Sequence, residues 1–380
     1  MILVATGTFI AFVITFFIMP FIIRIAKINK LFDIPDERKT HTYPISSLGG
    51  VGIITGLAIS LLLVSDFTLG NSEFQYYLAC FFIIFILGVI DDIFVLHPLK
   101  KVFGQLVVAS ILTAKTHLLI SNLEGLAGVL EMNGTFSYIV SFFTIILVIN
   151  SFNLIDGVDG LAGSLGLISS LSFGLFFYIN NNIPFAVLGF TMSGSLLAFL
   201  CYNFPPAKIF MGDSGSMMIG LVNAILFIKF VQTAGSATAY PVSSSIGIGF
   251  CFIIIPLLDV LRVFIIRLTK GVSPFAPDRN HLHHLLLNRG LSHTSVTILL
   301  SVSAVCFAVF GFFIQYLNIN LTALILIMVF FSGVFVVKYF AQPKKHLHVV
   351  DAEELEPASL QNTKVLTLFH NKDKAALKEE

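Results

Sequence analysis

Long apolar stretches separated by short polar segments run along most of this 380-residue sequence. Several of them are long enough to cross a lipid bilayer, which takes about 20 helical residues. Hydrophobic residues make up 56% of the chain and charged residues only 11%, whereas a soluble domain carries about 25% charged residues. No stretch shows the alternating pattern of a transmembrane barrel, so we expect an all-α polytopic integral membrane protein.

We predict about eleven transmembrane helices that alternate between the two sides of the membrane. The predicted spans cover residues 2–23, 47–65, 76–90, 102–120, 137–152, 161–179, 184–203, 215–232, 246–268, 295–315 and 320–340. Loops on one predicted side carry many Lys and Arg residues, whereas loops on the other side carry none. The positive-inside rule then predicts that the N-terminus lies outside and the C-terminus in the cytoplasm. Residues 1–340 form the predicted membrane-embedded domain, and residues 341–380 a cytoplasmic tail.

Unusual polar clusters occur only on the predicted cytoplasmic side, whereas the outer loops carry ordinary turn residues. The clusters are "PDERKTH" (35–41), "DDIFVLHPLKK" (91–101), "NSFNLIDGVDGLAG" (150–163), "FMGDSGS" (210–216) and "SPFAPDRNHLHH" (273–284). Buried charge inside a bilayer is costly, so polar groups gather at the ends of spans. Five clusters on one side of the membrane predict one shared site there.

Asp91 and Asp92 end one of the apolar runs. A solvated helix end is the simpler interpretation of such a pair. Two adjacent carboxylates repel each other, however, and acidic groups at a helix C-terminus oppose the helix dipole. The pair therefore favours a bound cation or a catalytic function. Lys101 alone would be a topology signal, but beside two carboxylates it is a candidate phosphate ligand.

The stretch 150–163 places Asn150, Asn153, Asp156 and Asp159 at every third position. On a helix this spacing puts the four side chains on neighbouring positions of one face. A polar helix end that lines an internal cavity is the alternative. Four polar groups next to hydrocarbon need partners, so we expect a ligand there.

Asp213 lies between glycines at the start of a span. It could simply cap the helix, and the amides of a helix start also favour phosphate. His281, His283 and His284 follow Arg279; a zinc site is one interpretation, and anion binding fits better because no cysteine is nearby. Inside the ninth predicted span we interpret Asp259 and Arg262 as an ion pair that neutralises itself.

Together these motifs resemble the polyprenyl-phosphate N-acetylhexosamine-1-phosphate transferases. The resemblance covers about residues 1–340 and depends on "DDIFVL", "NLIDGVDGLAG", "FMGDSGS" and "KGVSPFAPDRNHLHH". It is strongest to the bacterial undecaprenyl-phosphate N-acetylglucosamine-1-phosphate transferases, which begin enterobacterial common antigen, O-antigen and teichoic acid assembly. The last motif separates the chain from the peptidoglycan branch, whose loop reads Pro-Ile-His-His-His-Phe-Glu.

The resemblance implies transfer of a sugar phosphate from a UDP-sugar to a lipid phosphate, with UMP released and Mg²⁺ required; Mn²⁺ is expected to substitute. It implies that Asn153 and Asp213 bind the metal. The residues that it makes catalytic are Asp91, Asp92, Asp156 and Asp159, of which the last two also line the nucleotide site. The residues that it makes substrate-binding are Lys39, Lys101, Phe210, Arg279, His281, His283 and His284, with Phe210 stacking on uracil.

The implied partners are UDP-N-acetylglucosamine, undecaprenyl phosphate and the lipid bilayer of the bacterial inner membrane, with the site facing the cytoplasm. No nucleic-acid partner is expected, and a homodimer stays open. Direct attack by the lipid phosphate and double displacement through an Asp are both open, and we favour direct attack. Another UDP-N-acetylhexosamine is the main alternative. A transporter of an anionic solute or a membrane scaffold fits worse, because the clusters all lie on one side.

Overall fold

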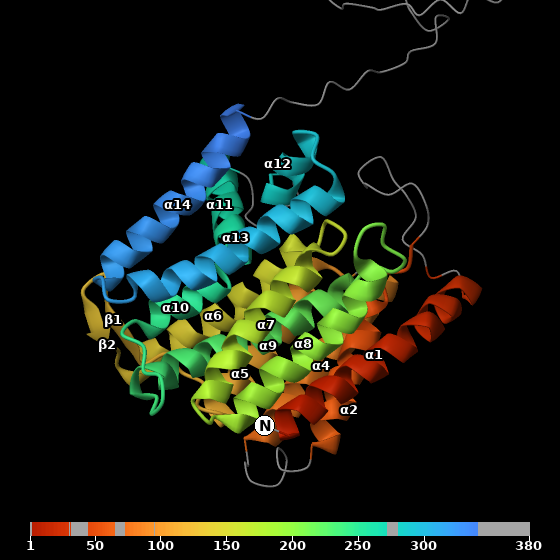
Figure 1. The fold of residues 1–380 in the computed structure, drawn as a ribbon, viewed down its shortest axis with the longest axis horizontal. Coiled ribbons are helices and arrows are strands. Elements are labelled where there is room, and N and C mark those ends of the chain that lie inside the picture. Colours follow the sequence, from red (N-terminus) through yellow and green to blue (C-terminus); the bar gives the residue numbers. More distant parts are fainter. Residues whose placement is uncertain are drawn as a thin grey trace, which may run out of the picture. The chain divides into compact units, whose positions relative to one another are not determined.

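The computed structural model describes residues 2–29, 31, 45–64, 73–94, 96–271 and 280–340. Its longer helices are α1 (Ile2–Ile28), α2 (Gly49–Leu63), α4 (Phe74–Phe94), α5 (Pro98–Lys115), α6 (Gly134–Ile155), α7 (Leu161–Ile179), α8 (Ile183–Asn203), α9 (Gly212–Thr233), α11 (Ile254–Thr269), α13 (His293–Ile314) and α14 (Ile319–Phe340) (Figure 1). The shorter elements are α10 (Ser245–Phe252), α12 (Leu282–Asn288), a 3₁₀ turn (Ala234–Ser236) and the strands β1 (Asn122–Leu126) and β2 (Val129–Glu131).

Each predicted span coincides with helical structure, so the part of the chain that the structure describes is that of an all-helical polytopic membrane protein, apart from the small hairpin. Among the described residues, 8 helices are long and apolar enough to cross a membrane, or 9 if α10 and α11 count as one bent span. Helix α2 is shorter, with 15 residues, and α5 is not among the 8. The predicted count of about eleven spans and the predicted orientation stay predictions. The predicted tail, 341–380, lies outside the described residues.

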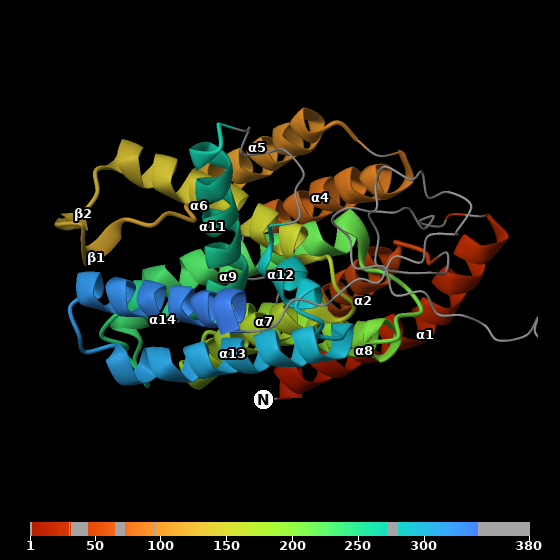
Figure 2. The same ribbon diagram turned by 90° about the horizontal axis from the view of Figure 1, so that it is seen from above.

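Helix α9 lies at the centre of the bundle. Its most apolar window is 89% buried, whereas the corresponding window of α14 is 22% buried. Helices α2, α4, α6, α7, α8 and α10 all contact it (Figures 1 and 2). A helix that is apolar on every side suits this enclosed position, and its first turn is therefore placed where several other helices begin or end.

Glycines let the start of α9 approach its neighbours at backbone distance. A side chain at Gly50 in α2 would overlap the backbone of Gly215, and one at Gly88 in α4 would overlap the backbone of Ser214. Gly212 adopts φ +74°, in the left-handed region that favours glycine. These contacts hold α2, α4 and α9 close together at one end of the bundle.

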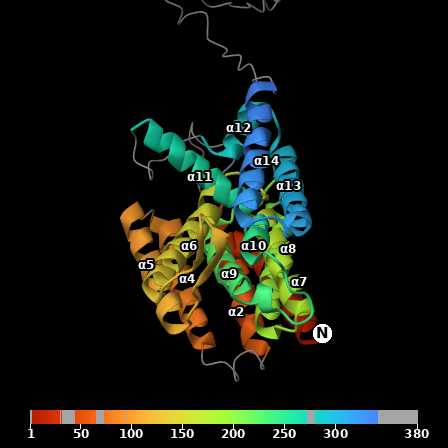
Figure 3. The same ribbon diagram turned by 90° about the vertical axis from the view of Figure 1, so that its left-hand side faces the viewer.

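The ninth predicted span is broken rather than continuous. Helices α10 and α11 meet at Ile253 at an angle of 84°, and Figure 3 shows α11 leaving the direction of α10. Pro256 falls in the first turn of α11. Proline lacks the N–H that a continuous helix would bond to residue 252, so the sequence favours a new helix start here.

A β-hairpin lies at the opposite end of the bundle, where the sequence predicted only turns. Glu124 in β1 accepts hydrogen bonds from the Ser245 N–H at 2.7 Å and the Ser244 hydroxyl at 2.9 Å. Asn320 Nδ2 donates to the Gly125 carbonyl at 2.9 Å. The hairpin therefore connects the start of α10 to the start of α14, and Figure 2 shows it beside the start of α14.

Candidate active site

A lysine between two carboxylates forms the centre of the candidate site. Lys101 lies in the first turn of α5, and its ammonium group forms ion pairs with Asp91 near the end of α4 and Asp213 at the start of α9. The Asp91 side chain is 4% exposed, and those of Lys101 and Asp213 are 25% and 28% exposed. Asp91 Oδ1 also accepts the Leu96 N–H at 2.5 Å, which closes the turn after α4. Three helices thus bring one positive and two negative charges to one point.

Asn153 joins this cluster from the last turn of α6. Its Nδ2 donates to Asp213 Oδ1 at 2.9 Å and to Ser216 Oγ at 3.0 Å. Because both hydrogen bonds use the Nδ2 group, Oδ1 is the atom that Asn153 can offer to a ligand. The predicted metal ligands Asn153 and Asp213 are therefore in direct contact.

Asp92 follows Asp91 in sequence but contacts a different group. Its Oδ1 accepts the Asp213 N–H at 2.6 Å, and its Oδ2 accepts the Ser214 N–H at 3.2 Å and the Ser214 hydroxyl at 2.6 Å. Asp92 therefore caps α9 from another helix. The alternative that Asp213 is the N-cap is wrong, because that position is Met211, which makes no side-chain cap hydrogen bond. Of the N–H groups at this helix start, those of Asp213 and Ser214 are occupied by Asp92 and are not free for a phosphate.

The predicted helical face of residues 150–159 is wrong in its second half. Helix α6 ends at Ile155, so Asn150 and Asn153 lie on the helix while Asp156 and Asp159 lie in the turn beyond it. Glycines at 157 and 160 favour this turn, because glycine is unfavourable inside a helix. The spacing of three therefore spans a helix and a turn rather than one face.

Asp156 is half-buried in that turn. Burial, together with the negative charges of Asp213, Asp92 and Asp159, raises the pKa of the Asp156 carboxyl group to about 8. A carboxyl group surrounded by other carboxylates is stabilised in its charged form by a cation. The charge of Asp156 in this turn therefore interacts with the charges of Asp213 and Asp92 in the Lys101 cluster.

Asp159 connects the turn to two other segments. Its Oδ2 accepts the Ala207 N–H at 3.3 Å, and its Oδ1 lies 3.4 Å from His293 Nδ1. Its carbonyl oxygen accepts the Thr297 hydroxyl at 2.8 Å. The first turns of α13 are thus attached to the site. Sequence reasoning missed His293 and Thr297, because no local motif connects them to residue 159.

His283 faces the same turn from α12. A Cβ added at Gly157 would overlap His283 Nε2, so the imidazole ring lies directly against the backbone of the turn. His283 is 2% exposed. Burial, together with the neighbouring His284, lowers the pKa of His283 to about 3. The imidazole is therefore neutral near pH 7 and can offer a ligand a hydrogen bond but no positive charge.

His281 is held in place by the ion pair of α11. Asp259 Oδ1 accepts Arg262 Nη2 and the Leu282 N–H, both at 2.9 Å, and Asp259 Oδ2 lies 2.9 Å from His281 Nδ1. Arg262 also donates to the Asn280 carbonyl. The predicted Asp259–Arg262 ion pair is confirmed, and its further contacts attach the start of α12 to α11.

The other predicted substrate residues are placed less centrally. Phe210 is half-buried before α9, where its N–H donates to the Ser46 carbonyl at 2.7 Å. The rings of His283 and His284 have centroids 4.3 Å apart. Lys39 and Arg279 lie outside the described residues, so their roles stay predictions.

The polar clusters share one end of the bundle, where α4, α6 and α8 end and α5, α7, α9 and α13 begin. At the opposite end, Gln232 of α9 donates to the carbonyls of His117 at 2.8 Å and Leu119 at 3.0 Å. Four of the five predicted clusters have described residues at the same end. The first cluster, 35–41, lies outside the described residues.

The donor atoms of the cluster suit a hard cation. Asp91, Asp213 and Asn153 supply oxygens, and the Lys101 ammonium group already lies between the two carboxylates. Oxygen ligands are those that Mg²⁺ prefers, with water and phosphate oxygens completing its shell. In the described part of the chain, no three His, Cys, Asp or Glu side chains are grouped to hold a metal ion. The zinc interpretation of the histidines therefore gains no support, and the cluster fits a cation shared with a phosphate.

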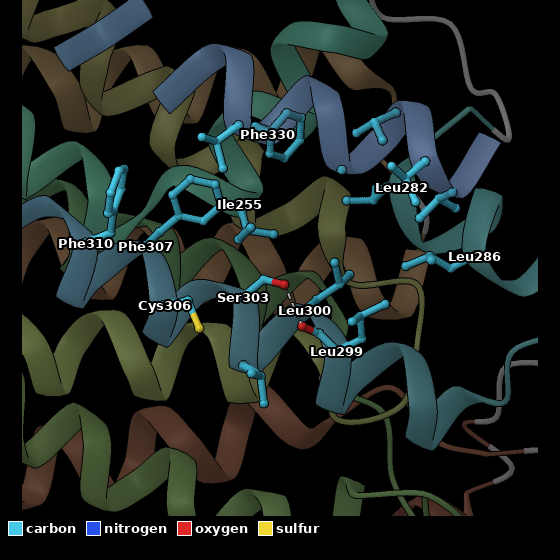
Figure 4. Close-up of a pocket in the computed structure, with 16 residues that line it drawn as sticks. Ile255, Leu282, Leu286, Leu299, Leu300, Ser303, Cys306, Phe307, Phe310 and Phe330 are labelled. Atoms are coloured by element: carbon cyan, nitrogen blue, oxygen red, sulfur yellow. Dashed lines mark hydrogen bonds between the residues drawn. The ribbon is translucent and has the colours of Figure 1, made fainter. Parts of the chain in front are cut away.

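An apolar pocket of about 720 Å³ lies on the other side of α12. Figure 4 shows its lining, which comes from α11, α12, α13 and α14. Leu282 and Leu286 of α12 line this pocket, whereas His283 of the same helix contacts Gly157. One short helix thus separates the polar cluster from an apolar surface.

Comparisons with known proteins agree with this geometry. Residues 74–231, which include Asp91, Lys101, Asn153 and Asp213, match the model of the family described as glycosyl transferase family 4. The chain is 30% identical to the undecaprenyl-phosphate alpha-N-acetylglucosaminyl 1-phosphate transferase of Yersinia pestis, over 74% of this chain and 76% of that protein. It is 29% identical to the Escherichia coli (strain K12) protein of the same name, over 82% and 84%. It is 32% identical to the decaprenyl-phosphate N-acetylglucosaminephosphotransferase of Mycobacterium leprae (strain TN), over 70% and 72%.

Proposed function

Since the chain belongs to glycosyl transferase family 4, we propose that it transfers N-acetylglucosamine 1-phosphate from UDP-N-acetylglucosamine to undecaprenyl phosphate. The products are a lipid-linked pyrophosphate sugar and UMP. Relatives whose names state a transfer of this kind match over 70–82% of the chain. The proposal therefore concerns the whole membrane-embedded part and not one motif.

The observation that carries the proposal is the position of Lys101 between Asp91 and Asp213 at the end of apolar helices. Both reactants are anionic, since one brings a pyrophosphate and the other a phosphate. Their approach needs positive charge in a place that a lipid headgroup can reach. A cluster where the helices end meets both needs.

In the proposed reaction, an oxygen of the lipid phosphate attacks the phosphorus that carries the sugar, and the bond from that phosphorus to the UMP oxygen breaks. The acceptor has a second pKa near 6, so it is mostly dianionic at pH 7 and needs little help from a base. We therefore favour direct attack over a covalent intermediate on an Asp, because alignment of two bound substrates suffices. A phosphorylated Asp trapped during turnover would contradict this preference.

Mg²⁺, held by Asp213 and Asn153, would neutralise part of the charge that develops on the phosphate oxygens. Lys101 binds a phosphate oxygen as a point charge. Asp91 orients Lys101 and the acceptor. Asp92 contributes as a positioning residue, because its contacts hold the start of α9.

The remaining assignments follow from the turn after α6. Asp156 lines the nucleotide side of the site, and Asp159 holds the turn against α13. His283, as a neutral imidazole, donates a hydrogen bond to phosphate, and His281 is oriented by Asp259. Phe210 stacks on uracil. Lys39 and Arg279 are proposed to contact the donor and its phosphates.

We place the protein in the bacterial inner membrane with this site on the cytoplasmic side, because the basic loops lie on that side of the sequence pattern. The transfer would be the first lipid-linked step of a cell-surface polysaccharide of the O-antigen, enterobacterial common antigen or teichoic acid type. A UDP-sugar is a water-soluble cytoplasmic donor, which agrees with this side.

Another UDP-N-acetylhexosamine is the alternative donor, and competition between UDP-N-acetylglucosamine and UDP-N-acetylgalactosamine in the same assay separates the two. A transporter of an anionic solute has less support. Transporter sites lie near the middle of the membrane, whereas the polar clusters described here lie where the helices end.

The test is a transfer assay with labelled UDP-N-acetylglucosamine and undecaprenyl phosphate in detergent, with Mg²⁺, with Mn²⁺ and with EDTA. We expect lipid-linked label and UMP with either metal and almost none with EDTA. Asp213→Ala should lose about a hundredfold or more of the rate, as expected for removal of a charge-stabilising group. Glu131→Ala, which removes an exposed carboxylate at the opposite end of the bundle, is the matched control. Full turnover in EDTA, or equal rates for both variants, would refute the proposal.

A further inference from the structure

A pair of amide side chains, the buried Gln105 and the half-buried Asn150, joins α5 to α6 below the candidate site. Asn150 Nδ2 donates to Gln105 Oε1 at 2.7 Å, and Gln105 Nε2 lies 3.4 Å from Asn150 Oδ1. Gln105 Nε2 also lies 3.7 Å from the Met217 sulfur in α9. Gln105 is 1% exposed. From α5, the helix of Lys101, this glutamine therefore contacts α6 and α9, the helices of the proposed metal ligands.

Each contact of this pair lies one helical turn from a residue of the site. Gln105 follows Lys101 by four positions and Met217 follows Asp213 by four. Asn150 precedes Asn153 by three positions. Residues three or four apart lie on the same helix face, separated by about 4.5–6 Å along the axis. The pair thus lies one helical turn below the polar contacts of Lys101, Asn153 and Asp213.

Hydrogen bonds that are shielded from water restrict how two helices can move against each other. The Gln105 amide is almost fully enclosed, so sliding or rotating α5 against α6 would break its hydrogen bonds with Asn150 where no water can replace them, whereas Asn150 Nδ2 would keep its bond to the Ile146 carbonyl at 2.8 Å. Apolar side chains around it would tolerate small shifts better, because dispersion contacts are not directional. The amide pair therefore selects one register of α5 against α6.

We propose that Gln105 and Asn150 are positioning residues, which set the register at which Lys101, Asn153 and Asp213 meet. This inference rests on the proposed function, because it concerns the geometry of that site. The pair does not touch the substrates. Its effect is exerted through the first turn of α5, the last turn of α6 and the first turn of α9.

A reciprocal exchange separates this role from simple stabilisation. Gln105→Asn shortens one partner and Asn150→Gln lengthens the other, so each single variant mismatches the pair. The double variant restores its total length. Ser170→Ala is the matched control, because it removes a polar pair that is fully buried, in which Asn223 Nδ2 donates to Ser170 Oγ at 3.1 Å. Asn223 lies ten residues beyond Asp213, about 15 Å along α9.

Two readouts are compared for purified protein in detergent. The first is the Mg²⁺ concentration that gives half of the maximal transfer rate. The second is the rise in melting temperature caused by Mg²⁺ together with UMP, which needs no turnover. We expect each single variant to raise the half-saturating Mg²⁺ concentration about tenfold, the loss expected for one hydrogen bond. The double variant should return to within about threefold of wild type.

The inference is overturned if the single variants fold and match Ser170→Ala in both readouts, or if the double variant is no better than the worse single variant. Should a single variant fail to fold, Gln105→Met, which keeps the length and removes the amide, is tested against the same control. If wild type makes no lipid-linked sugar, the proposed function fails. The Mg²⁺-dependent melting temperature then still decides whether the pair positions the cation site.

Discussion

Replacement of Asp92 by Asn tests the hydrogen bonds that connect α4 to the start of α9. The wild-type carboxylate accepts three hydrogen bonds, from the Asp213 N–H and from the N–H and hydroxyl of Ser214. Asn has nearly the same shape but only one acceptor oxygen, and its NH₂ group cannot accept the remaining donors. The variant therefore removes bonds without opening a cavity.

The size of the effect follows from those contacts. The variant loses one bond if its oxygen takes the Oδ2 position and two if it takes the Oδ1 position. A hydrogen bond to a charged group contributes about 1.5–3 kcal/mol, so the loss before relaxation is about 1.5–6 kcal/mol. We expect about 3 kcal/mol to remain after water and small shifts satisfy part of the loss. If that energy holds Asp213 in place, the half-saturating Mg²⁺ concentration rises about a hundredfold.

The assay is the initial rate of transfer as a function of Mg²⁺ concentration and of pH. We expect the rate at saturating Mg²⁺ to fall far less than the rate at low Mg²⁺. Ser214→Ala is the control, because it removes only the hydroxyl contact and keeps the charge; about a tenfold rise is expected.

A different result would refute the positioning role of Asp92. If Asp92→Asn lost most of its rate at every Mg²⁺ concentration, kept the wild-type half-saturation and lost one limb of the pH–rate profile, Asp92 would be an acid or base in the reaction.

Two further predictions concern the histidine segment. Burial lowers the pKa of His283 to about 3, so between about pH 6.5 and about pH 3 only the unfolded chain takes up a proton at this residue. As the pH falls through this range, the free energy of unfolding of wild type should decrease by up to about 1.4 kcal/mol per pH unit relative to that of His283→Gln. Melting temperatures in detergent from pH 7.5 to 5 check this, and parallel curves for the two proteins would contradict it. Asp259→Asn leaves the buried Arg262 guanidinium without its carboxylate, so we expect a loss of about 3–5 kcal/mol of stability. The double variant Asp259→Asn with Arg262→Met should regain stability, because no unpaired charge stays buried. It should not regain transfer activity, because His281 still lacks the carboxylate that holds it. A double variant with full transfer activity would show that the His281 contact is dispensable.

Elements of the fold that depend on the bilayer could be predicted from sequence. Every stretch that hydropathy predicted to span the membrane coincides with helical structure, and 8 or 9 of the described helices are long and apolar enough to cross it, because the apolar thickness of a bilayer sets the length of a span. Polar clusters were predicted to share one end, and the described ones do. The Asp259–Arg262 pair could also be predicted, since its residues lie one turn apart.

The parts that could not be predicted depend on contacts between distant segments. Asp92 caps α9 by accepting the N–H of Asp213, which lies 121 residues later in the sequence, and nothing near residue 92 indicates that partner. The spacing of three in 150–159 favoured one helix face, but the glycines at 157 and 160 stop the helix first. The Glu124 contacts are of the same long-range kind, because a short strand with a glycine gives no pattern that differs from a turn.

The glycines around the start of α9 restrict how the site can change in evolution. At positions 50, 88 and 215 the backbones of α2, α4 and α9 leave no space for a side chain. Substitutions there would push apart the helices that hold Asp91 and Asp213. A lineage that acquires a preference for a different sugar must therefore vary elsewhere, for example in the turn at 156–159 or around 280–284. Divergence among such enzymes should accumulate at the periphery of the cluster, while the proposed metal ligands Asn153 and Asp213 stay the same.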